Sequence, residues 1–233
     1  MIIKSFFNTT EQQIDARRWN PYLGISINNK AFTCDYIAGF MKWALPRSRE
    51  RAVVVVVDII QHINNEVFDR SKPLSAIEKA FRKADDIHHL CDEAKFRLQP
   101  DEADRLVILD WTDIVYDEYF QHNLMILKKE YEQNLSFREA LQSITRRNLG
   151  TIISRMNESQ IETLTHYLLY ELPELITGFR HEGIHYNLNV YPGKIASIYA
   201  ELIELDFFHD ILAKLRLIGD MASVEAYLEE GYG

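Results

Sequence analysis

A serine that follows a short apolar stretch is the first residue in this chain whose type and place suit chemistry. Ser26 directly follows the short apolar stretch 22–25, and an amphipathic stretch begins near Phe32. A strand, a tight turn and a helix in this order open an α/β sheet, and such sheets bind ligands at the carboxyl ends of their strands. Backbone N–H groups at the start of the helix would stabilise negative charge on a reacting oxygen. The simpler alternative is a loop serine that caps the helix.

A phenol and a carboxylate form a second candidate group. Tyr167 and Glu171 are four residues apart, so they share one face of the helix predicted around them. Pro173 lies in the same pattern and predicts a kink beside the pair, because it removes one helix hydrogen bond. A partly buried pair of this kind can hold an ammonium group and relay protons. Alone, the pair would be better explained by a surface glutamate and a packing tyrosine.

Strands that alternate with helices are expected to position these groups. The β-branched run 52–57 is typical of a central parallel strand that is covered on both faces. Further strands are predicted at 22–25, 105–110 and 186–190, and helices at 32–45, 71–97, 117–156 (with a break near Gly150), 157–175 and 195–215. Residues 1–19 carry no predicted element, and the tail from Arg216 is ambiguous. This order indicates one Rossmann-like α/β domain over residues 1–233, with a mainly parallel sheet flanked by helices.

Composition limits the function classes. The chain has 233 residues, of which 47% are hydrophobic, so it can bury a sizeable core. Cys34 and Cys91 are too few for a disulfide framework and lack metal-ligand spacing, which suits a reducing compartment. No signal peptide is visible, and no apolar run is long enough to cross a bilayer. We therefore expect a cytoplasmic protein without a membrane segment.

The charge pattern argues against broad nucleic-acid binding but leaves room for a local basic face. The net charge is −9. Three basic residues nevertheless fall on one face of the helix predicted at 71–97, namely Lys79, Arg82 and Lys83. A second basic cluster follows the helix predicted at 32–45 and consists of Arg47, Arg49 and Arg51. Acidic residues interrupt the first face, so a solvated helix surface is its alternative explanation.

Two enzyme classes compete for the remaining motifs. His181 and His185 flank Glu182 in an HExxH pattern, which on a helix binds zinc and activates water, with Glu201 or Glu204 as a third ligand. Gly183 and the strand predicted immediately afterwards indicate a helix end, where this geometry fails. A serine hydrolase is disfavoured because Asn28 stands where a G-x-S-x-G elbow needs its last glycine.

Several short motifs together resemble the cyclodipeptide synthase family. Their order and mutual spacing agree over some 170 positions, and they are Gly24-Ile25-Ser26 with Asn29, Tyr167-x-x-x-Glu171-x-Pro173, and Tyr191-Pro192. The resemblance implies a fold similar to the catalytic domain of tyrosyl-tRNA synthetases. It also implies synthesis of a cyclic dipeptide from two aminoacyl-tRNAs that bind in succession, without ATP, a cofactor or a metal.

The resemblance assigns roles to individual residues. The family's nucleophilic serine falls on Ser26, and the tyrosine and glutamate that hold the aminoacyl amino group fall on Tyr167 and Glu171. Tyr191 corresponds to a tyrosine of late proton transfer, and Gly24 to the family's glycine. Beside these motifs, Tyr22 and Asn189 are expected to shape the first substrate pocket, for a small or polar as well as a hydrophobic residue.

The chain departs from the family pattern at one point. One branch of the family pairs Asn at the position of Asn29 with His after the second tyrosine, whereas the other branch has Pro there. This chain has both Asn29 and Pro192, which places it in the proline branch with the asparagine retained. A non-catalytic Rossmann-like module that binds tRNA is the remaining alternative, although every matched polar residue is present.

Overall fold

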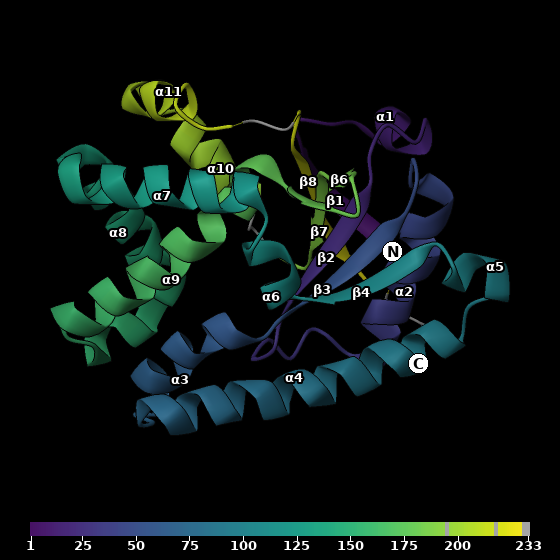
Figure 1. The fold of residues 1–233 in the computed structure, drawn as a ribbon, viewed down its shortest axis with the longest axis horizontal. Helices are drawn as coiled ribbons and strands as arrows, with labels where there is room; N and C mark the ends of the chain where they lie inside the picture. Colours follow the sequence, from purple (N-terminus) through teal and green to yellow (C-terminus); the bar gives the residue numbers. More distant parts are fainter. Residues whose placement is uncertain (194–195, 217–218, 230–233) are drawn as a thin grey trace.

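Six strands form the central sheet of the computed structural model, which describes residues 1–193, 196–216 and 219–229 (Figure 1). Their order across the sheet is β1 (Ile2–Phe7), β8 (Ala222–Tyr227), β7 (Leu188–Tyr191), β2 (Pro21–Ser26), β3 (Ala52–Val57) and β4 (Leu106–Asp110). Neighbouring strands from β8 to β4 pair in parallel, and β1 pairs antiparallel to β8. The predicted mainly parallel α/β fold is confirmed.

Strand β3 separates two layers of the core. All six of its residues are buried, which explains its unbroken β-branched sequence. Val54 and Val56 pack in one core with α2 (Cys34–Ala44) and α4 (Pro73–Phe96). Val53, Val55 and Val57 pack on the opposite face, in a second core with α6 (Trp111–Val115) and α7 (Glu118–Gln133). The sheet is therefore covered on both faces.

A third apolar core lies among helices beside the sheet. It joins α7 to α8 (Leu135–Leu149), α9 (Glu158–Thr177), α10 (Ala196–Ile203) and α11 (Asp206–Leu212). Figure 1 shows these helices gathered on the left of the sheet, while α4 runs along its lower side. Leu168, Leu172 and Leu175 of the predicted apolar stripe pack in this core. Leu164, Leu168 and Leu175 also line the cavity described below, so the stripe and the site share one side of α9.

Short elements complete the chain. They are α1 (Glu11–Asp15), η1 (Leu45–Arg47), η2 (Ile59–Gln61), α3 (His62–Phe68), α5 (Pro100–Ala103), η3 (Gly150–Arg155) and the hairpin of β5 (Phe179–His181) and β6 (Ile184–Tyr186). Among the described residues, no helix combines the length and hydropathy that a membrane crossing requires.

Several predicted boundaries were wrong. Residues 1–19 contain β1 and α1, and the ambiguous tail contains β8; β1 is an edge strand with little buried surface, so it lacks the alternation by which strands are recognised. The helix predicted at 117–156 is broken at Asn134, which caps α8 through its side chain. The strand predicted at 186–190 is divided between β6 and β7, and the helix predicted at 195–215 is divided between α10 and α11.

Candidate active site

Ser26 lies at the carboxyl end of β2, as the sequence predicts. The strand runs through Gly24 to Ser26, and the turn comes only afterwards. Helix α2 begins at Cys34 and is capped by Thr33, so it does not start directly at the turn that follows the serine. The backbone N–H of Asn29 instead donates to the carbonyl of Ser26 at 2.9 Å and closes the turn.

Gln61, which the sequence did not single out, connects the serine to the helix that carries the phenol and the carboxylate. Its side-chain Nε2 donates to Ser26 Oγ at 3.2 Å and to the Tyr167 hydroxyl at 2.6 Å. Its Oε1 accepts from the amides of Asn28 at 3.2 Å and Asn64 at 2.8 Å, which fixes the orientation of the amide. Gln61 is fully buried at the end of η2. Its place four residues after a central strand is the only hint that the sequence offers, and no local pattern marks it as a site residue.

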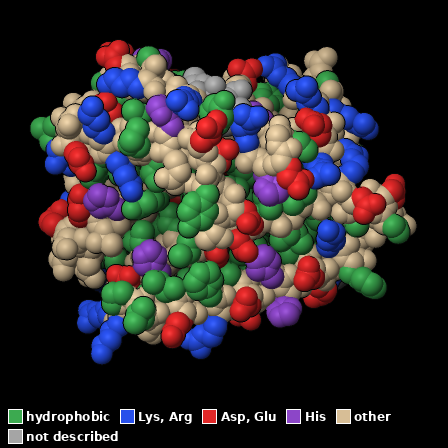
Figure 2. Space-filling view, in the orientation of Figure 1, with side chains coloured by type: hydrophobic (Ala, Val, Ile, Leu, Met, Phe, Trp, Pro, Cys, Tyr) green, Lys and Arg blue, Asp and Glu red, His purple; other side chains and the backbone are tan. Residues whose placement is uncertain are grey.

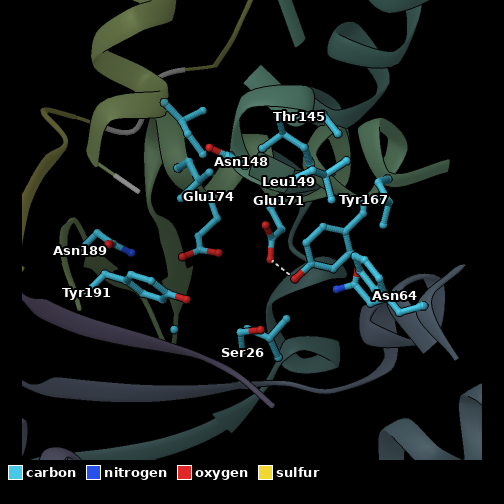
Figure 3. Close-up of a pocket in the computed structure, with 17 residues that line it drawn as sticks. Ser26, Asn64, Thr145, Asn148, Leu149, Tyr167, Glu171, Glu174, Asn189 and Tyr191 are labelled. Carbon is cyan, nitrogen blue, oxygen red and sulfur yellow. Dashed lines mark hydrogen bonds between the residues drawn. The ribbon is translucent and has the colours of Figure 1, made fainter. Parts of the chain in front are cut away.

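Tyr167 and Glu171 lie on one face of α9, and their side chains touch. The Tyr167 hydroxyl donates to Glu171 Oε1 at 2.6 Å (Figure 3). Burial raises the pKa of Glu171 to about 7, against the opposing effect of this hydrogen bond. Burial and the charge of Glu171 raise the pKa of Tyr167 well above its ordinary value. A carboxyl group with a pKa near neutrality is suited to accept and release a proton.

Tyr191 and Tyr167 lie on either side of Ser26, and Asn29 holds the Tyr191 hydroxyl. Its hydroxyl accepts from Asn29 Nδ2 at 3.2 Å, and its ring packs edge-on against Phe32. Burial raises the pKa of Tyr191 to about 12, so the phenol keeps its proton near neutral pH. Asn29 therefore has a contact within the site: it positions the hydroxyl of Tyr191.

These groups surround one cavity of about 400 Å³. Figure 3 shows Ser26, Tyr167, Glu171 and Tyr191 directed toward it from different elements. Gly24 and Asn189 also line it, and Tyr22 lies beneath them in the strand, paired with Asn189 of β7. The structure thus brings the predicted catalytic residues together at the cavity with Gly24 and Asn189, while Asn29 contacts it through Tyr191 and Tyr22 is fully buried behind it.

A second carboxylate in the cavity was missed. Glu174 is one turn beyond Glu171 on α9 and is 5% exposed. Burial and the nearby charge of Glu171 together raise its pKa to about 8, against the opposing effect of a hydrogen bond from Tyr22. The spacing of three from Glu171 and seven from Tyr167 was the signal, because both spacings return to the same helix face.

The predicted basic face on α4 is partly neutralised by partners. Lys79 pairs with Asp69, and Lys83 donates to Asn28 Oδ1, whereas the Arg82 side chain is exposed. Because Asn28 also bonds Gln61, the position of Lys83 is tied to the cavity. In Figure 2, acidic and basic side chains are mixed along the lower side, where α4 runs.

Two side chains of the second basic cluster are also paired. Arg47 bonds Asp15 at 2.9 Å, and Arg51 bonds Glu182 at 2.9 Å. Arg49 donates its backbone N–H to the carbonyl of Trp19 at 2.8 Å.

The HExxH stretch is a β-hairpin, so the helical zinc geometry is not formed. His181 pairs with Ile184 across the turn, where Glu182 and Gly183 have φ values of 50° and 78°. His185 Nε2 lies 2.7 Å from the carbonyl oxygen of Thr177. In the part of the chain that the structure describes, no three His, Cys, Asp or Glu side chains converge to hold a metal ion.

Comparison with known proteins shows which family this chain resembles. The family model for cyclodipeptide synthase matches residues 5–204, whereas a search of curated proteins gave no match. The fold is similar to a Mycobacterium tuberculosis protein described as showing that cyclodipeptide synthetases are related to type I tRNA synthetases, with 18% identity, a TM-score of 0.71 and coverage of 98% of this chain and 96% of that chain.

Two further solved structures resemble this chain. A cyclodipeptide synthase from Bacillus thermoamylovorans is 14% identical, with a TM-score of 0.72 and coverage of 94% of this chain and 93% of that chain. One from Candidatus Glomeribacter gigasporarum, described as bound to Phe-tRNAPhe, is 14% identical, with a TM-score of 0.59 and coverage of 92% and 89%. Since the family model spans most of the sequence, the chain belongs to the cyclodipeptide synthase family, whose members are tRNA-dependent aminoacyltransferases.

Proposed function

We propose that this protein uses two aminoacyl-tRNAs in succession and releases a cyclic dipeptide through aminoacyl and dipeptidyl esters of Ser26. The observation that carries the proposal is the hydrogen-bonded set of Ser26, Gln61, Tyr167 and Glu171 at one cavity. The tRNA-bound relative from Candidatus Glomeribacter gigasporarum supports an aminoacyl-tRNA as the partner. The reaction needs no cofactor and no metal, because an aminoacyl ester is already activated.

The first step is acyl transfer to the serine. Ser26 Oγ attacks the ester carbonyl of the first aminoacyl-tRNA, and the ribose oxygen leaves with the proton. Glu171 pairs with the α-ammonium of the bound aminoacyl group, and the Tyr167 hydroxyl steadies the carboxylate. This arrangement holds the acyl group on Ser26 and directs its nitrogen toward the cavity.

The second step forms the first peptide bond. Glu171 accepts a proton from the α-ammonium, and the free amine attacks the ester of the second aminoacyl-tRNA, whose ribose oxygen leaves as a hydroxyl. The raised pKa of Glu171, about 7, suits this exchange with an amine. The product is a dipeptidyl ester on Ser26.

Cyclisation releases the product and restores the serine. The terminal amine of the dipeptide attacks the Ser26 ester, the second peptide bond forms, and Oγ regains a proton. Tyr191 is the proton relay in this step, and the bond from Asn29 fixes its hydroxyl. We assign the chain to the proline branch because Pro192 follows Tyr191, with Asn29 retained as the residue that positions the phenol.

We place the tRNA on the side of the cavity that faces α4. Arg82 is an exposed cation in the middle of this helix, and Lys79 and Lys83 flank it. These contacts are to phosphates, so they carry little sequence information. The partners and the reducing conditions suggested by the two free cysteines are those of the cytoplasm.

The proposal is tested with purified protein and charged tRNA. Mass spectrometry of the reaction should detect diketopiperazines, and intact-mass measurement should detect an aminoacyl adduct on the wild type. Ser26→Ala should lack both the adduct and the product, since no other hydroxyl takes the place of the nucleophile. An adduct of the same mass on Ser26→Ala would remove Ser26 from the mechanism.

A further inference from the structure

The cavity contains a carboxylate that the proposed reaction does not use. Glu174 is 95% buried (5% exposed), and Figure 3 shows its carboxylate directed into the cavity beside that of Glu171. Its Oε1 lies 3.7 Å from the position that a Cβ on Gly24 would take. The Glu174 carboxylate therefore faces strand β2 at the one residue that has no side chain.

The geometry of β2 leads from the serine to this carboxylate. Tyr22, Gly24 and Ser26 are alternate residues, so they share one face of the strand. An acyl group on Ser26 has room to extend over Gly24, and it reaches the level of Glu174 after about two strand residues, ~6.6 Å. Tyr22 and its partner Asn189 on β7 form the far end of this path. An extended side chain of medium length fits this distance.

The far end of the path accepts hydrogen bonds. Asn189 is 3% exposed, and its Oδ1 has no partner among the described residues. The Tyr22 hydroxyl donates to the Glu174 backbone carbonyl at 3.5 Å and also interacts with the Glu174 side chain. A carboxylate has two acceptor oxygens, so that of Glu174 can accept from a ligand as well. A ligand that reaches this point must supply N–H or O–H donors, because unpaired buried acceptors are costly.

The charge balance specifies the kind of donor. None of the described residues that line the cavity is Lys, Arg or His, yet two carboxyl groups face it. Burial raises the pKa of Glu171 to about 7 and that of Glu174 to about 8, as expected for carboxyl groups that lack a cationic partner. In the proposed reaction the α-ammonium of the substrate pairs with Glu171. A second cationic nitrogen would pair with Glu174.

We propose that Tyr22, Glu174 and Asn189 form a specificity subsite that selects a first aminoacyl group whose side chain ends in a cationic nitrogen, as in lysine or arginine. The inference rests on the function proposed above, because it places the acyl group on Ser26. Glu174 is a specificity-determining residue in this arrangement: the side-chain nitrogen donates to its carboxylate and to Asn189 Oδ1. Gly24 keeps the path between Ser26 and Glu174 open.

The test compares aminoacyl groups on one and the same tRNA, so that tRNA recognition does not contribute. Wild-type protein is mixed with lysyl, arginyl, Nε-acetyllysyl and leucyl groups, each carried by tRNALys, and the rate of adduct formation on Ser26 is followed by intact mass. We expect the lysyl or the arginyl group to react faster than the leucyl group by at least about a hundredfold. Acetylation of the lysyl group should remove the preference for lysine.

Matched variants connect the preference to Glu174. Glu174→Gln keeps the size of the side chain and should reduce the preference for the cationic group by at least about tenfold, whereas Glu174→Leu should favour the leucyl group. Glu158→Gln removes the same charge from the exposed start of α9 and should leave the preference unchanged. The Glu174→Leu variant also tests the inference if the glutamine variant folds poorly.

Two outcomes would overturn the inference in distinguishable ways. Faster acylation of Ser26 by the acetylated or the leucyl group than by either cationic group would reject the subsite while the proposed function stands. Absence of an adduct with every charged tRNA, including total charged tRNA, would reject the proposed function and the subsite with it.

Discussion

Burial of Glu171 gives its carboxyl group a pKa that suits proton transfer. The carboxyl group is held by the Tyr167 hydroxyl at 2.6 Å, and burial raises its pKa to about 7. A carboxyl group in this range changes protonation state at little cost, which suits a group that must first bind an ammonium and then accept its proton.

Replacement of this pair separates charge from hydrogen bonding. Glu171→Gln keeps the size of the side chain but removes its charge and basicity, so product formation should fall by at least about a hundredfold. Tyr167→Phe removes one hydroxyl and should cost about tenfold. Quantification of diketopiperazine from charged tRNA checks both values. A normal yield from Glu171→Gln would exclude the carboxylate from the mechanism.

The same residue predicts a pH dependence. Because the pKa of Glu171 is raised to about 7, the free enzyme should lose activity as the pH falls through this value and the base becomes protonated. The rate of single-turnover peptide formation, measured against pH, should show this acidic limb in the wild type. The residual activity of Glu171→Gln should lack it. A flat profile in the wild type would show that another group is the base.

Gln61 is a positioning residue, because one side-chain nitrogen contacts both Ser26 and Tyr167. Gln61→Met keeps an unbranched side chain of similar size without the amide, so the serine and the phenol lose a common donor. We expect acylation of Ser26 to slow by about tenfold or more while tRNA affinity stays constant. Single-turnover rates and a binding titration measure the two quantities. Equal losses in rate and in binding would instead indicate a general disturbance of the fold.

Helix α9 is the element that assembles most of the site. Tyr167, Glu171 and Glu174 are spaced by four and three residues, so the helical period alone places them on one face. The sheet contributes Ser26 from β2 and Tyr191 from β7, whose parallel pairing brings both carboxyl ends to the same edge. The site is therefore the junction of one helix with two parallel strands.

Helix α4 is the element on which tRNA binding is predicted. Arg82→Ala together with Lys83→Ala should weaken tRNA binding and reduce its dependence on log salt concentration by about one unit per lost phosphate contact. Filter binding at several salt concentrations measures both effects. The double variant Lys42→Ala with Lys129→Ala removes two exposed cations from α2 and α7 and should leave the salt dependence unchanged. If the two double variants behave alike, α4 presents only a solvated face.

Two buried carboxyl groups lower the stability of the whole molecule when they ionise. The pKa of Glu171 is raised from 4.5 to about 7, and that of Glu174 from 4.5 to about 8. Between the unfolded pKa of 4.5 and the raised folded values, the folded protein holds protons that the unfolded chain has released. The free energy of unfolding should therefore fall as the pH rises from 4.5 to about 8.

Thermal unfolding checks this dependence. The Tm of the wild type should be lower at about pH 8.5 than at about pH 5.5, because both carboxyl groups must then ionise while buried. Glu174→Gln retains only the carboxyl group of Glu171 and should show a smaller decrease. An equal decrease in both proteins would mean that Glu174 does not titrate in the folded state within this range.

The fold class, the family and the candidate site residues in short motifs could be predicted from the sequence. Run 52–57 identified the buried parallel strand because a strand covered on both faces must be apolar throughout. The spacing of Tyr167 and Glu171 placed them on one helix face because the period of a helix is a local property. The family prediction is confirmed by the match over residues 5–204.

Tertiary structure decided what depends on contacts between distant segments. Gln61 follows β3 and reaches Ser26 and Tyr167 only because η2 folds over the end of the sheet, so no local pattern marks it. The exposed edge strand β1 has no amphipathic period and is defined by its pairing with β8, more than 200 residues away in sequence. The HExxH residues have the spacing for zinc, but two positive-φ residues make them a hairpin. The chemical character of the cavity was likewise decided by the pairing of β2 with β7 and by the approach of Glu174 to Gly24, because both bring together residues that are far apart in the chain.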